Sequence, residues 1–163
     1  MDQIIIFCAK HLFLAVPALF IIMWVQTTKK QRSEQALSLF LTIILAGVMD
    51  KIAGKLFYST RPFVAQNIEP LVKHAADNGF PSEHTLFCFA IATLIFLYKR
   101  NLGIAALIIS SIVGISRVAA HVHSPIDILG GAIIGVIAGY CGYFAAKKFI
   151  ARKSATKSVT DQP

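Results

Sequence analysis

Long apolar stretches separated by short polar links dominate the pattern of this chain. Five of them stand out, at residues 4–25, 36–58, 84–98, 102–120 and 126–146. Most approach the roughly 20 residues that a helix needs to cross about 30 Å of hydrocarbon. The third is the shortest, so we expect its helix to extend into the flanking polar residues. The pattern predicts an all-α fold, a polytopic membrane helix bundle of about five transmembrane helices.

The composition agrees with a membrane protein. Of the 163 residues, 56% are hydrophobic and 15% are charged, which is too little charge to coat a soluble domain of this length. We expect a single membrane-embedded domain over residues 1–150 and a basic, disordered cytoplasmic tail over residues 151–163. Cys8, Cys88 and Cys141 lie in apolar stretches, where free cysteine behaves as a small hydrophobe, so neither a disulfide nor a cysteine-based metal site is expected.

The sixteen lysines and arginines indicate how the bundle is oriented. Ten of them follow the first, third or fifth apolar stretch: Lys29, Lys30, Arg32, Lys99, Arg100, Lys147, Lys148, Arg152, Lys153 and Lys157. Five alternating helices place these ten on one side, which the positive-inside rule makes the cytoplasm. We therefore expect a multi-pass protein of the cell (inner) membrane with a cytoplasmic C-terminus. Topology accounts for the net charge of +8, so membrane lipid is the expected partner and nucleic acid is not.

Three polar clusters then share the opposite, extracytoplasmic face. They are residues 61–83, Arg117 and residues 121–127. Two helices begin at this face, and the free backbone N–H groups at their N-termini favour an anion. Arg61 and Arg117 add guanidinium groups, which grip phosphate oxygens in two-point contacts. The sequence therefore predicts a pocket for a phosphate group.

Two serines precede these helices. Ser82 stands at the N-cap position of the third helix, and Ser124-Pro125-Ile126-Asp127 has the cap, proline and acid that are typical of a helix start. A serine in this position is usually a cap and nothing more, and Asp127 could be only the acid of a capping box. Capping therefore stays open as an alternative to a functional role for these residues.

The histidines supply candidate chemistry. His123 and Asp127 are four residues apart, so the carboxylate can reach the imidazole and hold its tautomer. An imidazole held in this way can act as a base or a nucleophile, and His84, from a different link, could protonate a leaving oxygen. His121 is six residues from Asp127, a poor helical spacing, so we prefer His123. Together the residues predict a phosphoryl-transfer site.

These residues resemble the type-2 phosphatidic acid phosphatase superfamily, whose motifs are K-x6-R-P, P-S-G-H and S-R-x5-H-x3-D. The matches are Arg61-Pro62, Pro81-Ser82-Glu83-His84, and Ser116-Arg117 with His123 and Asp127 at the full spacing. The strings "RPFV" and "HAADNGFPSEHT" also resemble the bacterial undecaprenyl-diphosphatase branch, the bacitracin-resistance type.

The resemblance implies that His123 attacks phosphorus to give a phosphohistidine, that Asp127 orients it and that His84 protonates the departing group. The phosphate oxygens are then bound by Arg61, Ser82 and Arg117. Members of the superfamily need no metal, so neither a metal nor another cofactor is expected. The implied substrate is undecaprenyl diphosphate, which is hydrolysed to the monophosphate carrier that cell-wall synthesis uses again. A site facing outward suits that lipid.

Two positions depart from the motifs. Glu83 replaces the glycine of the second motif, which we interpret as a mark of the undecaprenyl branch. Lys55 is six residues before Arg61 where the first motif needs seven, and Gly54 occupies the motif position. In a continuous helix this offset turns the side chain about 120° away from Arg61. Whether Lys55 binds phosphate stays open, and Lys51 has no better spacing.

Several other polar or small residues carry more than one interpretation. His74 and Asp77 lie in the outer loop, where they are either solvated or part of the pocket rim. Asp50 and Lys51 must lie at membrane depth, since a helix that ended before them would be too short to span. A ridge of small residues predicts close helix packing within the bundle: Gly131, Gly135 and Gly139.

Two functions compete with the undecaprenyl-diphosphatase reading. One keeps the site and changes the lipid to phosphatidylglycerophosphate, phosphatidate or a lipid A phosphate. The other makes the His/Asp cluster a metal site in a small transporter or channel, because His-x-His and nearby carboxylates are also metal ligands. A metal site does not require the two arginines, Arg61 and Arg117.

Overall fold

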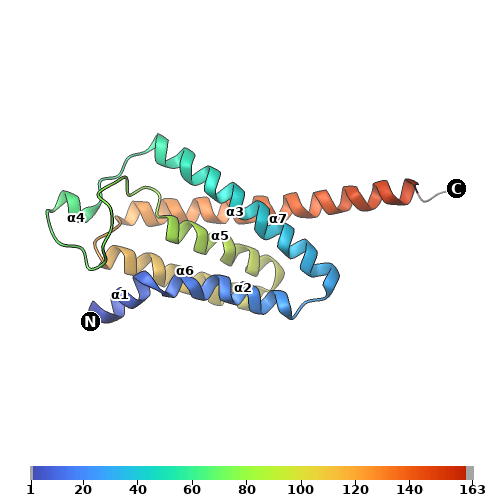
Figure 1. Cartoon of the computed structure of the whole chain (residues 1–163), viewed down its shortest axis with the longest axis horizontal. Helices are drawn as coiled ribbons and strands as arrows, with labels where there is room; N and C mark the ends of the chain where they lie inside the picture. The colour runs from blue at the N-terminus through green and yellow to red at the C-terminus, as the bar shows by residue number, and fades with distance from the viewer. Residues whose placement is uncertain (1, 161–163) are drawn as a thin grey trace.

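The computed structural model describes residues 2–160, with side chains described through residue 153, and its regular elements are helical (Figure 1). In chain order they are α1 (Asp2–Lys10), the 3₁₀ turn η1 (Leu12–Leu14), α2 (Ala15–Val25), α3 (Lys29–Leu56), α4 (Pro62–Ala65), α5 (Glu83–Tyr98), α6 (Arg100–Ala119) and α7 (Pro125–Thr160). Within the described residues the nearest approach to a sheet is an isolated bridge between Thr60 and Asn78. The all-α prediction is confirmed.

In the described part of the chain, three helices are long and apolar enough to cross a membrane: α3, α6 and the part of α7 that ends at Lys153. A fourth candidate span is made of α1 followed by η1 and α2. Its two parts are bent by 41° relative to each other. The fifth expected span is α5, whose 16 residues extend about 24 Å, less than the hydrocarbon thickness. The expected extension of this helix amounts to one residue, Glu83, because the backbone is extended at Ser82 and again at Lys99, where α6 follows at once.

The first apolar stretch was expected to form one continuous helix and is instead broken at His11. Pro17 provides the physical reason. Proline has no backbone N–H, so it cannot donate to the carbonyl of Phe13 one turn earlier, and its ring crowds that carbonyl. The thiol of Cys88 approaches this carbonyl oxygen at 3.9 Å. The helix bends where its own hydrogen bond is missing.

The short helix α5 lies inside the bundle and packs against α2, α3, α6 and α7. Its contact with α7 is close because α7 presents glycines to it. A methyl group on Gly131, Gly135 or Gly139 would collide with backbone carbonyl oxygens of α5 or of the residue before it. The predicted role of this ridge in packing within the bundle is confirmed.

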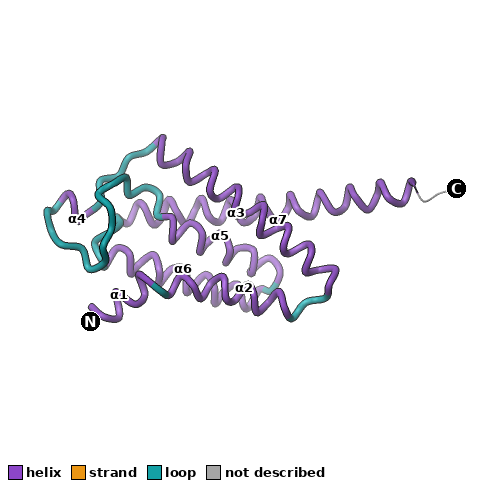
Figure 2. The backbone as a smooth tube through the Cα atoms, viewed as in Figure 1, coloured by secondary structure: helices purple, strands orange, loops and turns teal. Residues whose placement is uncertain are grey.

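The two ends of the bundle differ in character. The irregular segments around α4 and the link between α6 and α7 gather at one end, and the turns between α2 and α3 and between α5 and α6 lie at the other (Figure 2). At that second end, Lys99 donates a hydrogen bond to Gln26 (3.2 Å), which joins the two turns. The ends of the chain also separate, with α1 starting beside the irregular segments and α7 running out past the opposite end (Figure 1).

The basic segment at the C-terminal end is helical over its described part. Residues 151–160 continue α7, where the sequence analysis expects a disordered tail, and residues 161–163 of that tail lie outside the described residues. The three cysteines are free thiols.

Candidate active site

A cavity of about 350 Å³ lies at the end of the bundle where the irregular segments gather. The end of α3, the loop before α5, the first turn of α5 and the link between α6 and α7 contribute to its wall. His84 and His123, which come from different links, both line it, as does Arg61. The sequence analysis predicted that polar clusters remote in the chain would meet in one pocket. His121 does not line this cavity; it is exposed and sits at a backbone turn with a φ of 60°.

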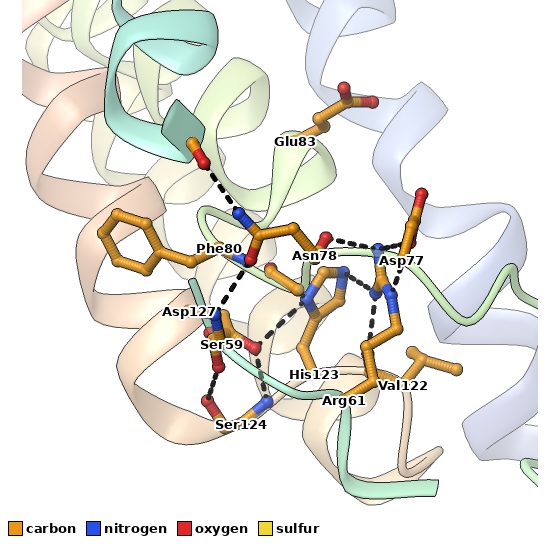
Figure 3. A network of polar contacts seen from close by, with 12 residues as sticks. Ser59, Arg61, Asp77, Asn78, Phe80, Glu83, Val122, His123, Ser124 and Asp127 are labelled. Atoms are coloured by element: carbon orange, nitrogen blue, oxygen red, sulfur yellow. Dashed lines mark hydrogen bonds and ion pairs between the residues drawn. The ribbon is translucent and has the colours of Figure 1, made fainter. Parts of the chain in front are cut away.

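The imidazole of His123 is held by hydrogen bonds from two sides (Figure 3). Its Nδ1 atom lies 2.9 Å from the carbonyl oxygen of Gly79 and 3.5 Å from a carboxylate oxygen of Asp127. Both neighbours are acceptors, so the proton belongs on Nδ1 and the lone pair on Nε2. Nε2 faces the guanidinium of Arg61 at 3.3 Å. The lone pair of Nε2 therefore points toward the guanidinium of Arg61, from which it accepts a hydrogen bond, and the ring is in the tautomer that a nucleophile requires.

Asp127 is fully buried in the first turn of α7. The carboxylate oxygen that faces His123 also accepts the backbone N–H of Ser124 at 2.8 Å. Asp127 therefore acts as the acid of a capping box and contacts the imidazole with the same oxygen. The two interpretations left open by the sequence, cap and catalytic partner, are compatible.

The surroundings keep the ring of His123 neutral. Burial lowers the pKa of His123 below its ordinary value of 6.5, and the charges of Arg61 and Arg117 lower it further. The hydrogen bond with Asp127 opposes these effects in part. A neutral imidazole is the form that can attack phosphorus.

Arg61 is the most connected residue of the site and is only 4% exposed. It donates to the carboxylate of Asp77 at 2.9 Å and to the carbonyl oxygens of Val122 (2.8 Å) and Asn78 (3.2 Å). Burial alone would raise the pKa of Asp77, but the hydrogen bond and charge of Arg61 outweigh it and lower that pKa. These contacts tie the loop before α5 to the link that carries His123.

Asn78 is a positioning residue that the sequence analysis missed. Its side chain donates to the carbonyl oxygens of Gly54 (2.8 Å) and Phe57 (3.0 Å) at the end of α3. Its side-chain oxygen accepts the backbone N–H groups of Ser59 (2.9 Å) and Phe80 (3.0 Å). One amide therefore caps the end of α3 and fixes the loop on both sides of Arg61 (Figure 3).

Two other predicted phosphate ligands, Arg117 and Ser82, are buried in the protein. Arg117 is 2% exposed and donates to the carbonyl oxygen of Ala9 at 3.2 Å. Within the described residues, its Nε and Nη2 atoms are buried without a hydrogen-bond partner. Ser82 is fully buried at the N-cap of α5, where its hydroxyl accepts a hydrogen bond from Thr85 rather than capping the helix. Neither Ser82 nor Arg117 lines the cavity as Arg61 does.

His84 occupies the first turn of α5 and lines the cavity. Its ring packs edge-on against Phe13, with 4.9 Å between the ring centroids. The preceding Glu83 does not present an isolated negative charge, because Lys51 lies 3.4 Å from its carboxylate and 3.2 Å from that of Asp50. Asp50 is buried and lines the cavity, as expected for an acid at membrane depth.

Lys55 also lines the cavity. The six-residue spacing would turn Lys55 away from Arg61 only in a continuous helix. The helix is not continuous there, because α3 ends at Leu56 and the chain is extended from Phe57. The change of direction brings Arg61 back toward the last turn of α3, so that the two residues line one cavity.

The competing metal-site reading has little support among the described residues. No three His, Cys, Asp or Glu side chains there are grouped closely enough to hold a metal ion. That interpretation rested on the His-x-His pair of His121 and His123. His121 is exposed, whereas His123 is buried, with 3% of its surface exposed.

Comparison with known proteins connects this geometry to a family. A family model described as the PAP2 superfamily matches residues 35–150. A protein named bacitracin transport permease protein BcrC from Bacillus licheniformis is 31% identical over 149 residues, 91% of this chain and 73% of that protein. Undecaprenyl-diphosphatase BcrC of Bacillus subtilis strain 168 is 29% identical over 140 residues, 86% of this chain and 72% of that protein.

Solved structures agree with the fold. The crystal structure of Aquifex aeolicus LpxE has a TM-score of 0.66 and 26% identity, covering 86% of this chain and 82% of its own. A PAP2-type phosphatidylglycerolphosphate phosphatase from Bacillus subtilis has a TM-score of 0.51 and 21% identity, covering 90% and 97%, and shows the fold alone. The three motif segments that build the cavity all fall within the matched residues 35–150, and the chain belongs to the PAP2 superfamily.

Proposed function

We propose that this membrane lipid phosphatase hydrolyses undecaprenyl diphosphate to undecaprenyl phosphate and inorganic phosphate. The relatives support this choice of lipid. Besides the Bacillus subtilis protein, a putative undecaprenyl-diphosphatase YbjG of Escherichia coli K12 is 34% identical over 142 residues, 84% of this chain and 69% of that protein. These matches extend over most of the chain and include the cavity.

One observation carries the mechanism: His84 and His123 line the same cavity, and the proton on Nδ1 of His123 leaves the lone pair on Nε2, which faces Arg61. Nε2 attacks the terminal phosphorus while the bond from phosphorus to the bridging oxygen breaks. His84 gives its proton to that oxygen, and the lipid monophosphate departs. The products of this step are the lipid phosphate and a phosphohistidine at His123.

Water completes the cycle. It attacks the phosphorus of the phosphohistidine, and His84, now deprotonated, accepts the proton from the water. Inorganic phosphate leaves and His123 is again neutral. Arg61 stabilises the charge on the phosphate oxygens in both steps, with Lys55 at the cavity wall and with the buried Arg117 and Ser82.

Burial of Arg117 supports its place in this scheme. Nε and Nη2 of Arg117 are buried donors without partners in the described chain. Leaving donors unpaired in a low-dielectric site costs free energy. A bound phosphate would supply acceptors for both.

Basic residues support the orientation that we propose, with the cavity on the extracytoplasmic face of the cell (inner) membrane. Lys29, Lys99 and Lys147 belong to segments away from the cavity, and positive residues are retained in the cytoplasm. An exposed residue of the cavity end, such as Lys73, tests this orientation. In a background without native cysteines, a cysteine at position 73 should react with a membrane-impermeant maleimide in intact cells, and labelling only after lysis would reverse the orientation.

Lipid A phosphate is the competing substrate. A 37% identical segment of 73 residues in the lipid A 1-phosphatase of Porphyromonas gingivalis favours it. This match covers 42% of this chain and 16% of that protein, less than the matches to the undecaprenyl-diphosphatases cover.

Phosphate release by purified protein distinguishes these substrates. The panel contains undecaprenyl diphosphate, phosphatidylglycerophosphate, phosphatidate and lipid A, each with and without a chelator. We expect the highest kcat/KM for undecaprenyl diphosphate, activity that persists in chelator, and no activity in His123→Ala. A higher kcat/KM for lipid A would overturn the proposed substrate, and an active His123→Ala variant would overturn the nucleophile.

A further inference from the structure

His74 belongs to none of the three motif segments, yet it lies in the cavity. Its ring meets that of His123 edge-on, with 5.8 Å between the ring centroids and 78° between the ring planes. It lines the same cavity as Arg61 and His84. The loop before α5 therefore brings a third imidazole to the place where phosphorus would be attacked.

The Nδ1 atom of His74 is buried and has no hydrogen-bond partner among the described residues. In that part of the chain only five side-chain atoms share this property, and two of the others are Nε and Nη2 of Arg117. Unpaired buried polar atoms are uncommon in folded proteins, and His74 is the residue with such an atom that lines the cavity in the described chain. An oxyanion in the cavity would be a partner for it.

The charge state of His74 suits a donor in a crowded cationic site. Burial lowers its pKa below the ordinary value of 6.5, and the charges of Arg61 and Arg117 lower it further, whereas a hydrogen bond with the backbone of Ala75 opposes these effects in part. The ring is therefore neutral near pH 7 and carries one N–H. It can add a hydrogen bond to a phosphate oxygen without adding repulsion to the two arginines.

The position of His74 is fixed from both sides. Two residues earlier, Val72 is buried in a small apolar cluster with Ala9, Ala120 and Val122, beside the link that carries His123. Three residues later, Asp77 pairs with Arg61 at 2.9 Å. The loop is thus attached to the cavity on either side of His74, so the ring contact with His123 is built into the fold.

We propose that His74 is a phosphate-binding residue, which donates a hydrogen bond from Nδ1 to a non-bridging oxygen of the phosphoryl group that His123 accepts. The inference rests on the phosphatase function proposed above but not on the identity of the lipid. It assigns to the loop before α5 a direct part in holding the transition state, beyond its support of Arg61.

A packing role for His74 makes different predictions from a hydrogen-bonding role. His74→Phe keeps an aromatic edge against His123 and removes the nitrogen. His74→Asn loses the aromatic ring and places an amide N–H near the position of Nδ1. If His74 donates a hydrogen bond, asparagine should replace it better than phenylalanine, whereas a packing role requires the opposite order.

The experiment measures binding of orthovanadate by calorimetry and the kcat/KM for undecaprenyl diphosphate, with purified full-length variants. We expect His74→Phe and His74→Ala to weaken vanadate binding and lower kcat/KM by roughly 10- to 100-fold, the range for a hydrogen bond to a charged group. His74→Asn should stay within about fivefold of the wild type. The control His121→Asn changes an exposed histidine at a backbone turn that asparagine tolerates, and should match the wild type.

Each outcome is informative. Wild-type vanadate affinity in His74→Phe would overturn the proposal, as would equal losses in the phenylalanine and asparagine variants. Thermal melting and gel filtration identify a variant that has not folded. The order of the vanadate affinities of the other two variants then still distinguishes a hydrogen-bonding role from a packing role. If the wild type binds vanadate but does not hydrolyse undecaprenyl diphosphate, the proposed substrate fails while the test of His74 stands.

Discussion

The Nδ1 atom of His123 lies closer to the carbonyl oxygen of Gly79, at 2.9 Å, than to the carboxylate of Asp127, at 3.5 Å. Two acceptors from different segments therefore hold the same tautomer of the ring. In a site where a carboxylate alone does this, its loss leaves the ring free to adopt the unproductive tautomer. Here the backbone carbonyl would still hold the proton on Nδ1 after the carboxylate is lost.

This arrangement predicts a moderate effect for Asp127→Asn. The substitution removes the negative charge next to the ring, but Gly79 still accepts the Nδ1 proton. We expect kcat to fall by roughly 10- to 100-fold, less than the roughly 10⁴-fold loss seen where the carboxylate alone sets the tautomer. His123→Ala, measured in parallel, should be inactive. A loss of about 10⁴-fold in Asp127→Asn would show that the carbonyl does not substitute for the carboxylate.

Gly79 should not tolerate a side chain. A methyl group at this position would lie 2.9 Å from the carboxylate of Asp127 and 3.1 Å from the carbonyl oxygen of Ser59, so one of them must move. We expect Gly79→Ala to lower the melting temperature, with a cost of about 1–3 kcal/mol, and to reduce kcat by displacing the acceptor of His123. Gly47→Ala is the matched control, because a methyl group at Gly47 meets nothing within 4 Å in α3.

The control should be neutral or slightly stabilising, since alanine favours a helix over glycine by up to about 1 kcal/mol. Thermal unfolding in detergent and phosphate release measure both effects. Equal behaviour of Gly79→Ala and Gly47→Ala would contradict the assignment of Gly79 to the site.

The acidic limb of the pH profile reports the protonation of His123. The neutral ring is the nucleophile, so kcat/KM falls as the pH drops through its pKa. Because burial and then the two arginines lower that pKa, the midpoint should lie below the ordinary value of 6.5. Asp127→Asn should move it lower still, since the hydrogen bond with Asp127 raises the pKa. A midpoint above 6.5 in the wild type would contradict the neutral nucleophile.

Two lysines at the cavity wall should differ in importance. Lys51 already lies within 3.4 Å of two carboxylates, Asp50 and Glu83, whereas Lys55 lies within 4 Å of none in the described part of the chain. The two carboxylates offset the positive charge of Lys51, so its net attraction for a phosphate is weaker. We expect Lys55→Met to raise KM by roughly tenfold and Lys51→Met by no more than roughly fivefold, the limit for an exposed ion pair. The reverse order would assign the motif role to Lys51.

Side-chain spacing was enough to predict which segments meet. Arg61 and His84 lie at the two ends of the connection between α3 and α5, and His123 lies between α6 and α7. The order of the motifs and the alternation of helices predict that all three lie on one face. Their presence in one cavity agrees with that expectation. Spacing worked here because each of these residues lies next to a helix end, and the helix ends are what the hydrophobic pattern determines most directly.

The residues that spacing missed act through the backbone or through an irregular loop. The acceptor of His123 is a carbonyl group of Gly79, and no side-chain pattern reports the direction of a carbonyl. For His74 the sequence left a solvated position and a position at the pocket rim open; it lines the cavity because the loop turns back on α3, a path without periodicity. Lys55 was misjudged because its angle to Arg61 was calculated along a helix that ends at Leu56, before Arg61 is reached. The bend at His11 was missed although Pro17 is visible in the sequence.

The last prediction concerns Asn78, whose side chain joins α3 to the loop. Asn78→Ala removes two donated and two accepted hydrogen bonds, and it leaves the carbonyl groups of Gly54 and Phe57 without this partner. We expect the free energy of unfolding to fall by about 1–3 kcal/mol. We also expect kcat/KM to fall, because the backbone carbonyl of Asn78 accepts a hydrogen bond from Arg61.

Asn78→Asp separates the two sides of this amide. Aspartate can still accept the N–H groups of Ser59 and Phe80, but its second oxygen faces the carbonyl groups of α3 where the asparagine donated. Repulsion between these oxygens should make the variant at least as unstable as Asn78→Ala. Asn101→Ala, an exposed asparagine in the first turn of α6, is the control and should melt with the wild type. If Asn78→Asp melted with the wild type as well, the donated bonds to α3 would not hold the loop, and Arg61 would have to be positioned by its contacts with Asp77 and Val122 alone.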